Sequence, residues 1–525
     1  MSLNKLNLHY TFEWIIFILM MVIQFGFLNT SPVYILDESK FVEAAREMFV
    51  SGNYWIPTFN ESLFVDKPPM QYFFMMLGFK FFGINAFGAR FFSAVFALLT
   101  VFFTYNFSHD FFGKKTARAT LFVLVSAFFF MQQFQIAVPD PYLIFFCSVA
   151  LFSFFRYYKS RKSFYLFSFY FLLGLGVLSK GPVAVALPGL SVALFLIFRG
   201  ELKKVFDYQP FTGLLGIVLI ALPWYWLIHI ETDGAWTRGF FVVHNLQRFS
   251  QAMEGHGGPF FVTLGYVLLG LLPFSFFLPQ AFRRALRKAK KPNFLFCLIV
   301  GMVFIVFFSA SSTKLPNYTM PCYPFLAILL GNYFDKKMDK IDQGWNRLSM
   351  ILLLLLTLIL PIAAVIGLQM NPYLRQVSYL GYGLIPTAAV SLLATIFLFF
   401  KNRKNWFYTI GFGWMLMALI LFGYIYPQLN EINPVTQTSK LLGKDKEFFV
   451  YQRMDPAFPF NYQRTFPVVN DVDEIEEYAA KHPNAYLMTN IRNSSALDSL
   501  GNWKLILKKK SLFEYHFTRI YQKRD

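Results

Sequence analysis

The densest group of ionisable side chains in this chain lies in residues 34–70, between two long apolar runs. An acidic pair, Asp37 and Glu38, comes first, and a second pair, Asp66 and Lys67, precedes two prolines that fix the backbone. Carboxylates can act as general bases, and lysines can bind phosphate. A helix start capped by an aspartate in an ordinary surface loop would explain the same acids. The stretch is therefore either an active-site loop or a capped surface loop.

Long uncharged runs recur along the rest of the chain, of which 56% is hydrophobic and 20% aromatic. Runs of about 18 or more such residues are typical of transmembrane helices. The sequence predicts a polytopic α-helical membrane protein with about thirteen spans. The first span is expected to be retained, because no small-x-small cleavage site follows it. The spans are centred in 12–29, 86–107, 118–135, 141–157, 163–179, 182–198, 211–230, 259–280, 293–310, 315–333, 347–369, 380–400 and 405–426.

Basic residues cluster in alternate loops of this arrangement. Residues 427–525 carry 14 Lys and Arg against 12 Asp and Glu, so +17 of the net charge of +19 lies in residues 1–426. An excess of this kind marks cytoplasmic loops rather than nucleic-acid binding. The clusters lie in 114–118, 156–162, 199–204, 283–291, 336–340 and 401–404. The positive-inside rule places them and the N-terminus in the cytoplasm, and residues 34–70 and the C-terminus in the periplasm.

A few basic residues lie on the outer side against this bias. They are Lys40, Lys67, Lys180, Arg248 and Lys314. An anionic ligand such as phosphate or pyrophosphate would account for the set. Salt bridges to nearby acids are the alternative for any one of them. Tyr318, close to Lys314, occupies a position that is also typical of an aromatic belt residue.

Other polar residues on the outer side admit two interpretations. Asp140, between two prolines in VPDPYL, is either a site acid or a turn former. His244 and Arg248 are four residues apart and would share a helix face, and His256 lies in a Gly-rich turn. Two histidines near Asp66 suggest a divalent metal such as zinc, although a lone histidine is more often a hydrogen-bonded polar residue.

The segments that flank these residues predict how they are held. Residues 38–51 are expected to form an amphipathic helix, and 70–83 a short helix at the membrane interface. After residue 426 the apolar runs shorten to strand length, at 447–451, 485–489, 503–507 and 513–521. Together with a helix at 472–481 they predict a small α/β domain, 427–525, after a transmembrane domain, 1–426, that includes the loop 30–84. The three cysteines lie in apolar segments and are expected to be buried thiols.

Taken in order, the motifs resemble the aminoarabinose transferases, in the GT-C class of polyprenyl-phosphate-sugar glycosyltransferases that includes protein O-mannosyltransferases. The resemblance covers about residues 10–335. The motifs are DESKFVEAAREMFVSGNYWIPTFNESLFVDKPPMQYF, VPDPYL, LSKGPVAVALPG, HNLQRF followed by His256, and KLPNYTMPCYP. The resemblance implies a GT-C fold and transfer of a sugar from undecaprenyl phosphate.

The resemblance also implies roles for individual residues. Asp37 matches the proposed catalytic aspartate of the family, and Asp140 matches a second essential outer acid. Lys40, Lys67 and Tyr318 match positions that contact the donor phosphate, and Lys180 and Lys314 are expected beside them. Lys40 stands where the family usually has arginine, so it lacks a bidentate guanidinium contact.

A second group of residues is expected around the acceptor and a metal. Glu38, His244 and Arg248 are expected to contact the acceptor or to assist the site. Asp66 stands where the family has glutamate, next to a divalent-metal position that His256 would complete. No Gly-rich phosphate loop occurs, so no nucleotide cofactor is expected.

These observations predict an inner-membrane enzyme that moves an aminoarabinose-like pentose or a hexose from undecaprenyl phosphate to lipid A in the periplasm. A protein or another envelope glycan is the alternative acceptor. A transporter or flippase for a lipid-linked substrate, or an envelope scaffold protein, is the alternative from another class. A transporter would carry ionisable residues near the bilayer midplane, whereas this chain keeps most of its acids at span ends. The protein is expected to act as a monomer.

Overall fold

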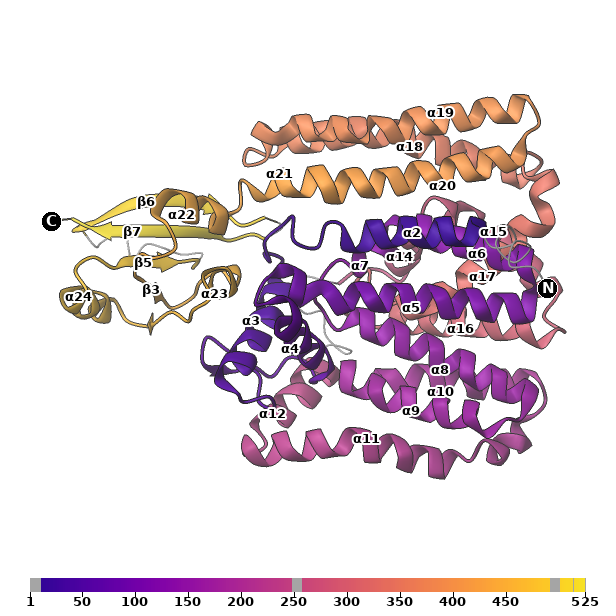
Figure 1. Cartoon of the computed structure of the whole chain (residues 1–525), viewed down its shortest axis with the longest axis horizontal. Coiled ribbons are helices and arrows are strands. Elements are labelled where there is room, and N and C mark those ends of the chain that lie inside the picture. The colour runs from indigo at the N-terminus through magenta and orange to yellow at the C-terminus, as the bar shows by residue number, and fades with distance from the viewer. Residues whose placement is uncertain (1–10, 248–256, 492–500, 513, 525) are drawn as a thin grey trace, which may run out of the picture.

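The computed structural model describes residues 11–247, 257–491, 501–512 and 514–524. Most of the chain forms a bundle of long helices that run roughly along one axis (Figure 1). A small β-sheet lies beyond one end of this bundle, and α3, α4 and α12 lie at that same end (Figure 1). The basic helix α15 lies at the opposite end (Figure 1). Polar loop segments and the C-terminal sheet therefore gather on one side.

The bundle is formed by helices from residue 11 to residue 430. They are α2 (Thr11–Phe25), α5 (Ala86–Phe112), α6 (Lys114–Ser126), α7 (Phe128–Gln133), α8 (Asp140–Ser160), α9 (Ser163–Lys180), α10 (Val183–Phe198), α11 (Pro210–Glu231), α14 (Val262–Gly270), α15 (Leu278–Arg287), α16 (Pro292–Ala310), α17 (Tyr323–Lys337), α18 (Trp345–Met370), α19 (Ile385–Phe399), α20 (Arg403–Ile420) and α21 (Tyr426–Asn430). Short 3-10 or π segments join several of them, namely η1 (Leu202–Tyr208), η3 (Phe274–Phe277), η4 (Met320–Cys322), η5 (Met338–Lys340), η6 (Arg375–Leu384) and η7 (Leu421–Ile425).

Length and composition show which helices can cross a bilayer. Within the ranges the structure describes, eight helices are long and apolar enough, and α14 with the segment from Phe274 to Arg287 forms a ninth candidate that is bent by 115°. The helices α2 and α10 are apolar but shorter. Helical residues occur at each of the thirteen predicted spans. The chain is a polytopic membrane protein, and the count of thirteen stays a prediction.

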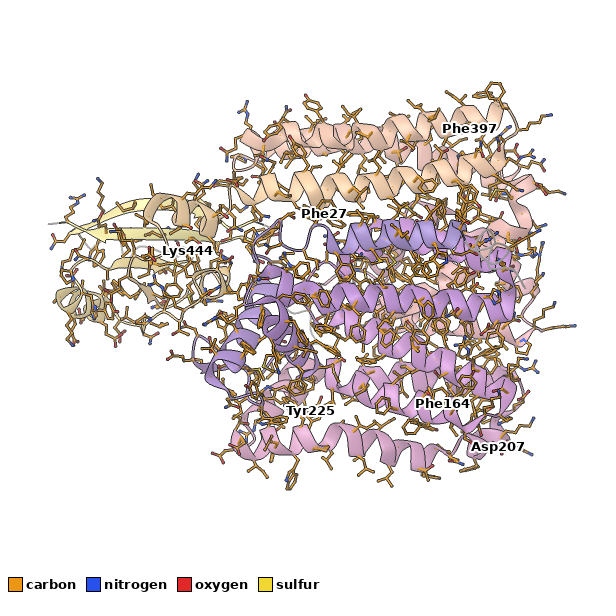
Figure 2. All side chains as sticks on the ribbon, viewed as in Figure 1. Phe27, Phe164, Asp207, Tyr225, Phe397 and Lys444 are labelled. Atoms are coloured by element: carbon orange, nitrogen blue, oxygen red, sulfur yellow. The ribbon has the colours of Figure 1, made fainter. Side chains whose placement is uncertain are left out.

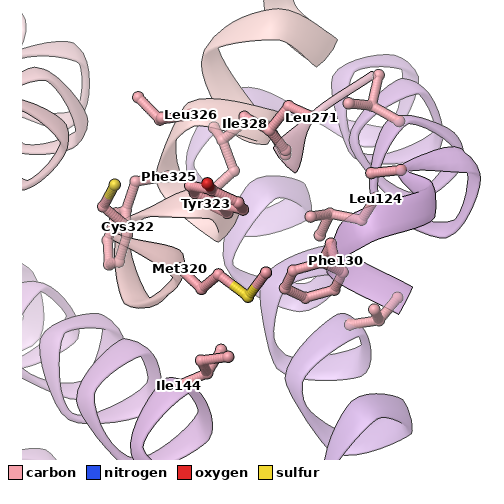
Figure 3. Packing of buried hydrophobic residues seen from close by; sticks show 14 of the residues in the cluster. Leu124, Phe130, Ile144, Leu271, Met320, Cys322, Tyr323, Phe325, Leu326 and Ile328 are labelled. Carbon is pink, nitrogen blue, oxygen red and sulfur yellow. The ribbon is translucent and has the colours of Figure 1, made fainter. Parts of the chain in front are cut away.

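Phenylalanine fills the interior of the bundle and also covers its outside. Phe130, Met320 and Phe325 are fully buried, where α7, α8 and the start of α17 meet (Figure 3). Phe164, on α9, projects from the outer surface and is 71% exposed (Figure 2). Large apolar side chains on both faces are expected of a helix bundle whose solvent is lipid.

Between the first and second bundle helices the chain forms two shorter helices and a hairpin. These are α3 (Leu36–Ser51), the two-residue strands β1 (Thr58–Phe59) and β2 (Ser62–Leu63), and α4 (Met70–Phe82). The helices predicted at 38–51 and 70–83 are therefore confirmed within two residues. Between α11 and α14 lie α12 (Ala235–Arg238) and a π-helical segment η2 (Gly239–Gln247).

The C-terminal segment forms a five-stranded sheet in the order β4-β3-β5-β7-β6. The strand β3 is parallel to β4 and β5, whereas β5, β7 and β6 are antiparallel neighbours. The elements are α22 (Pro434–Leu442), β3 (Phe448–Tyr451), α23 (Ala457–Tyr462), β4 (Val468–Val469), α24 (Val472–Lys481), β5 (Tyr486–Thr489), β6 (Trp503–Lys510) and β7 (Phe517–Lys523). The strand β4 and the helices α22 and α23 had no counterpart in the sequence prediction, because they are short.

The sheet is attached to the loop that contains α3. The side chain of Asn60 pairs with both backbone polar groups of Phe466, at 2.9 and 2.8 Å. Asn461 donates to the carbonyl of Val33 at 2.6 Å, and Gln463 donates to the carbonyl of Ile84 at 2.9 Å. The first loop and the C-terminal segment thus form one polar structure at the end of the bundle.

Close helix packing gives a test of the bundle. A Cβ atom at Gly331 on α17 would lie 2.3 Å from Oγ1 and 2.7 Å from the amide nitrogen of Thr120 on α6. Nothing lies within 4 Å of a Cβ built at Gly367 on α18. We expect Gly331→Ala to lower the midpoint of thermal unfolding in detergent by several degrees, because α6 and α17 must separate. Gly367→Ala, the matched control, should hold or raise it, since alanine is the better helix former. Equal midpoints for the two variants would contradict this packing.

Candidate active site

Asp37 lies in the first turn of α3 and its side chain is exposed. The helix begins at Leu36, and the residue at the cap position is Ile35, which makes no side-chain capping bond. Asp37 is therefore not the N-cap that the surface-loop interpretation of residues 34–70 required. The helix α3 lies at the end of the bundle next to the C-terminal sheet (Figure 1). This is a position from which Asp37 can reach a substrate.

Glu38, the next residue, is fully buried. Arg90 of α5 binds both of its carboxylate oxygens, with Nε at 2.6 Å and a terminal nitrogen at 2.9 Å. The same guanidinium donates to the carbonyls of Leu28 and Ser31. A buried carboxylate with a bidentate arginine partner is held in one place. Glu38 thus fixes the start of α3. Because its side chain is fully buried, it assists the site and does not contact the acceptor.

Glu38 also binds the segment that leads to Asp140. Its Oε1 accepts a hydrogen bond of 2.9 Å from the amide of Ala137. Three residues later Asp140 begins α8, where Pro139 is the cap residue. A single carboxylate therefore holds the starts of α3 and α8 against α5. The two acids predicted to be essential, Asp37 and Asp140, both lie close to this junction in the chain.

Asp140, Lys180 and Tyr318 form one cluster. The Nζ of Lys180, at the end of α9, donates to Oδ1 of Asp140 at 2.6 Å. The same Nζ lies 4.9 Å from the centre of the Tyr318 ring. A cation beside a carboxylate and over an aromatic face is doubly stabilised. Three residues predicted for the site from separate motifs are thus brought together.

Lys67 and Asp66 form a second buried pair. Lys67 Nζ donates to Oδ1 of Asp66 at 2.5 Å and to its backbone oxygen at 3.1 Å, and both residues are more than nine-tenths buried. Behind them, Tyr72 is completely buried; burial raises its pKa well above the usual value, and Asp66 adds to the shift. Pro68 and Pro69 join the pair to α4, so the ammonium group is held rigidly.

The pairing of Asp66 bears on the predicted metal site. An ammonium group 2.5 Å from Oδ1 would repel a divalent cation bound at the same oxygen. Within the described ranges no three His, Cys, Asp or Glu side chains are grouped to hold a metal ion. His256 lies outside the described residues. The residues present do not fit a metal at Asp66, and we derive no step through one.

Lys40 and Asp37 face a residue of the C-terminal segment. Glu514, between β6 and β7, interacts electrostatically with both of them. Burial raises the pKa of Glu514; His516 and Lys40 oppose this shift, and Asp455 and Asp37 add to it. A change of charge at Glu514 would therefore act on Asp37 and Lys40. Sequence reasoning missed Glu514, because nothing in its local pattern separates it from an ordinary turn residue.

The remaining predicted residues lie apart from these pairs or cannot be described. Lys314 is buried and its Nζ donates to the carbonyl of Ser311 at 2.6 Å. His244 belongs to η2, which begins after α12. Arg248, like His256, lies outside the described residues. Their predicted roles stay predictions.

A further buried pair lies along α3. Arg46 binds both oxygens of Glu43, at 2.7 and 2.6 Å. Burial raises the pKa of Glu43 to about 7, whereas Arg46 lowers it and the nearby Glu47 raises it. Glu47 accepts the hydroxyl of Thr58 and the amide of Asn60, which fixes the β1–β2 hairpin. The acids in the middle of α3 therefore stabilise the loop and do not face the predicted site.

Arg90 was also missed from the sequence. It lies inside an apolar run, and an arginine in such a place needs a buried partner. That signal could have identified it as structural, although not its partner 52 residues away. Arg90 holds Asp37 in place through Glu38.

The Arg90–Glu38 pair gives the first site prediction. Arg90→Met leaves a buried carboxylate without its partner, which should cost about 3–5 kcal/mol of stability. The double variant Glu38→Met with Arg90→Met should recover part of this loss, because it removes the unpaired charge. Lys481→Met, which breaks the exposed pair with Glu477, is the control and should leave the unfolding transition unchanged. Thermal unfolding in detergent measures all three, and a wild-type midpoint for Arg90→Met would contradict the assignment.

Comparisons with known proteins agree with this geometry. The sequence pattern of the dolichyl-phosphate-mannose-protein mannosyltransferase family matches residues 66–226. The undecaprenyl phosphate-alpha-4-amino-4-deoxy-L-arabinose arabinosyl transferase of Shewanella sediminis is 31% identical over 59% of this chain, and the match spans 57% of that relative. ArnT from Cupriavidus metallidurans, crystallised with undecaprenyl phosphate, has a TM-score of 0.79 and 19% identity over 98% of both chains. The archaeal oligosaccharyltransferase AglB of Archaeoglobus fulgidus has a TM-score of 0.52 and 13% identity, over 93% of this chain and 70% of its own.

The fold is that of the GT-C membrane glycosyltransferases ArnT and AglB. The similarity favours a glycosyltransferase over the transporter and scaffold alternatives. The chain is similar in sequence to the aminoarabinose transferases and, over residues 66–226, to the protein mannosyltransferases. The resemblance seen in the sequence motifs is thereby confirmed.

Proposed function

We propose that this enzyme transfers aminoarabinose from undecaprenyl phosphate to lipid A, at the periplasmic face of the inner membrane. The curated transferase relatives and the structural likeness to ArnT support this substrate pair. The observation that carries the proposal is the cluster of Asp140, Lys180 and Tyr318 at the end of α9. It supplies a partly exposed ammonium group where a lipid-linked phosphate would arrive.

Sugar transfer requires an acceptor, a leaving group and residues that stabilise the charge developing on the leaving phosphate. The bond between the anomeric carbon and the phosphate oxygen breaks, and its electron pair leaves with undecaprenyl phosphate. Lys67 and Lys180 can stabilise the charge that develops on this phosphate, because each ammonium is already held by a carboxylate. Lys40 and Tyr318 are proposed to contact the same phosphate, because they match phosphate-contacting positions of the family. Lys314, four residues before Tyr318, is proposed to add its positive charge beside the donor phosphate.

The acceptor oxygen forms the new bond to the anomeric carbon. A phosphate of lipid A already carries a nucleophilic oxygen, so Asp37 would orient it and stabilise the positive charge that develops on the sugar. A hydroxyl acceptor would instead give its proton to Asp37 as general base. The match to the protein mannosyltransferase family favours the hydroxyl of a protein as the second candidate acceptor. Asp37 would serve either acceptor.

The arrangement in the membrane follows from the same proposal. We take the end of the bundle with α3, α4 and the C-terminal sheet as periplasmic, and the end with α15 as cytoplasmic. The basic residues Arg283, Arg284 and Arg287 on α15 support this orientation. Thirteen spans, a transmembrane domain of residues 1–426 and a periplasmic domain of residues 427–525 complete it. The enzyme acts as a monomer.

Replacement of the catalytic acid tests the mechanism. Asp37→Asn keeps the size of the side chain but removes its charge, so we expect sugar transfer in membranes to fall by at least 100-fold. The unfolding midpoint should stay at the wild-type value, because the side chain is exposed. Asp233→Asn is the matched control: it is an exposed acid of the outer loop at positive φ, a conformation that asparagine accepts, and it should leave transfer unchanged. Transfer near the wild-type rate in Asp37→Asn would contradict the role of Asp37.

Donor binding is tested at Lys67. Lys67→Ala removes one phosphate ligand, so the KM for the undecaprenyl-phosphate donor should rise about 10-fold or more while the KM for the acceptor changes little. Lys80→Ala, at an exposed lysine at the other end of α4, serves as the control. The measurement is an in vitro transfer assay in which donor and acceptor are varied separately. An equal rise for donor and acceptor would argue against a phosphate contact.

A further inference from the structure

A basic cleft lies between the C-terminal sheet and the bundle. The end of β6 carries Lys508, Lys509 and Lys510, and these residues line a cavity of about 340 Å³. The opposite wall comes from the loop after α18 and includes Asn371, Tyr373 and Gln376. No site residue discussed above takes part in it. We refer to this cavity as the β6 cleft.

Two lysines of the β6 cleft, Lys508 and Lys510, each lie over an aromatic ring. Lys508 Nζ lies 5.5 Å from the centre of the Phe517 ring, and Lys510 Nζ lies 5.2 Å from the centre of the Tyr373 ring. The two rings contact each other edge to face, with centres 5.3 Å apart. Residues 508 and 510 share one face of the strand, because side chains alternate along it. Two ammonium groups are therefore held on one aromatic pair that joins the sheet to the bundle.

Among the described residues, these lysines differ from others in the same domain because no ion pair with an acid is found for them. Lys481 and Lys523 pair with Glu477 and Glu476, at 2.7 and 2.8 Å. Across the described residues, no carboxylate lies within ion-pair distance of Lys508, Lys509 or Lys510. Three adjacent positive charges without a counter-ion repel one another. An anion in the cleft would remove that repulsion.

The position of the cleft indicates where the anion comes from. The helix α18 is a candidate membrane span and ends at Met370, which is 78% exposed and lies between two residues of the cleft wall, Leu368 and Asn371. Tyr373 and Tyr379 follow and are both exposed, as is typical of residues at the membrane interface. Leu368, Leu374 and Ile432 form an apolar part of the wall. The cleft therefore lies level with lipid headgroups and has an apolar side for the glycerol or acyl part.

We propose that the β6 cleft binds the phosphate of a lipid headgroup in the leaflet at this end of the bundle. Lys508 and Lys510 contact the phosphate oxygens from one face, and Lys509 adds its charge. Bound lipid attaches the C-terminal sheet to the membrane surface. The site is separate from the Asp140–Lys180–Tyr318 cluster, so the proposal stands whether or not the sugar and acceptor proposed above are right.

The full-length protein in a neutral maltoside detergent allows a direct test. Dioctanoyl phosphatidic acid is titrated and the bound fraction is read by native mass spectrometry, with dioctanoylglycerol as the probe that lacks phosphate. The wild-type protein should bind dioctanoyl phosphatidic acid and should not bind dioctanoylglycerol. Lys508→Gln with Lys510→Gln should weaken binding about 10- to 30-fold. The control pair Lys481→Gln with Lys504→Gln removes the same charge from exposed positions of the same domain and should bind as wild type.

Each outcome decides the proposal. An equal loss of binding in the control pair would show attraction by net charge alone and overturn it. Inorganic phosphate that binds as tightly as phosphatidic acid would overturn the lipid assignment. Should the double variant not fold, Lys508→Gln alone carries the test, because this lysine is exposed, and it should weaken binding about 5-fold. Binding by that variant at wild-type strength would also overturn the proposal.

Discussion

The ion pair between Glu38 and Arg90 is the interaction on which the site depends. Both side chains are buried, and the guanidinium also satisfies the carbonyls of Leu28 and Ser31. Such a pair is costly to desolvate and is stable only when every donor and acceptor is used, as is the case here. Because Glu38 binds the amide of Ala137 as well, one carboxylate sets the positions of α3, α5 and α8. Asp37, next to it in the chain, is positioned along with the start of α3.

The same physical rule explains the lysines of the site. A lone ammonium group inside an apolar protein is strongly disfavoured, so Lys67 and Lys180 each have a carboxylate within 2.6 Å. These pairs add little to stability, because the cost of desolvation cancels most of the attraction. Their effect is to hold cations in fixed positions, with further N–H groups able to meet a phosphate. The salt bridges to nearby acids that were the alternative for these lysines are present, with Asp66 for Lys67 and with Asp140 for Lys180.

The C-terminal segment is part of the same structure. Its helix α23 packs on α3, where Phe460 joins the apolar cluster of Phe41 and Met48, and Tyr34 joins the apolar core of the sheet. Glu514 then reaches the charges at the start of α3, and the β6 cleft opens on the lipid side of the same strand pair. A substrate at Asp37 and a lipid at β6 would therefore both act on the position of one small sheet.

The sequence by itself determined the membrane class, the helices α3 and α4 and the identity of the outer acids and lysines. Long apolar runs, local periodicity and charge bias are short-range properties, so they can be recognised in the sequence without knowledge of the fold. Tertiary structure decided the pairing. Asp140 and Lys180 are 40 residues apart, and Glu38 and Arg90 are 52 apart, and no local pattern encodes such contacts. It also showed that Glu38, predicted to contact the acceptor or to assist the site, is a buried support, and that Asp66 is paired with Lys67. Burial and partner choice are set by the packing of distant helices, and this is the physical reason that only the folded chain could show them.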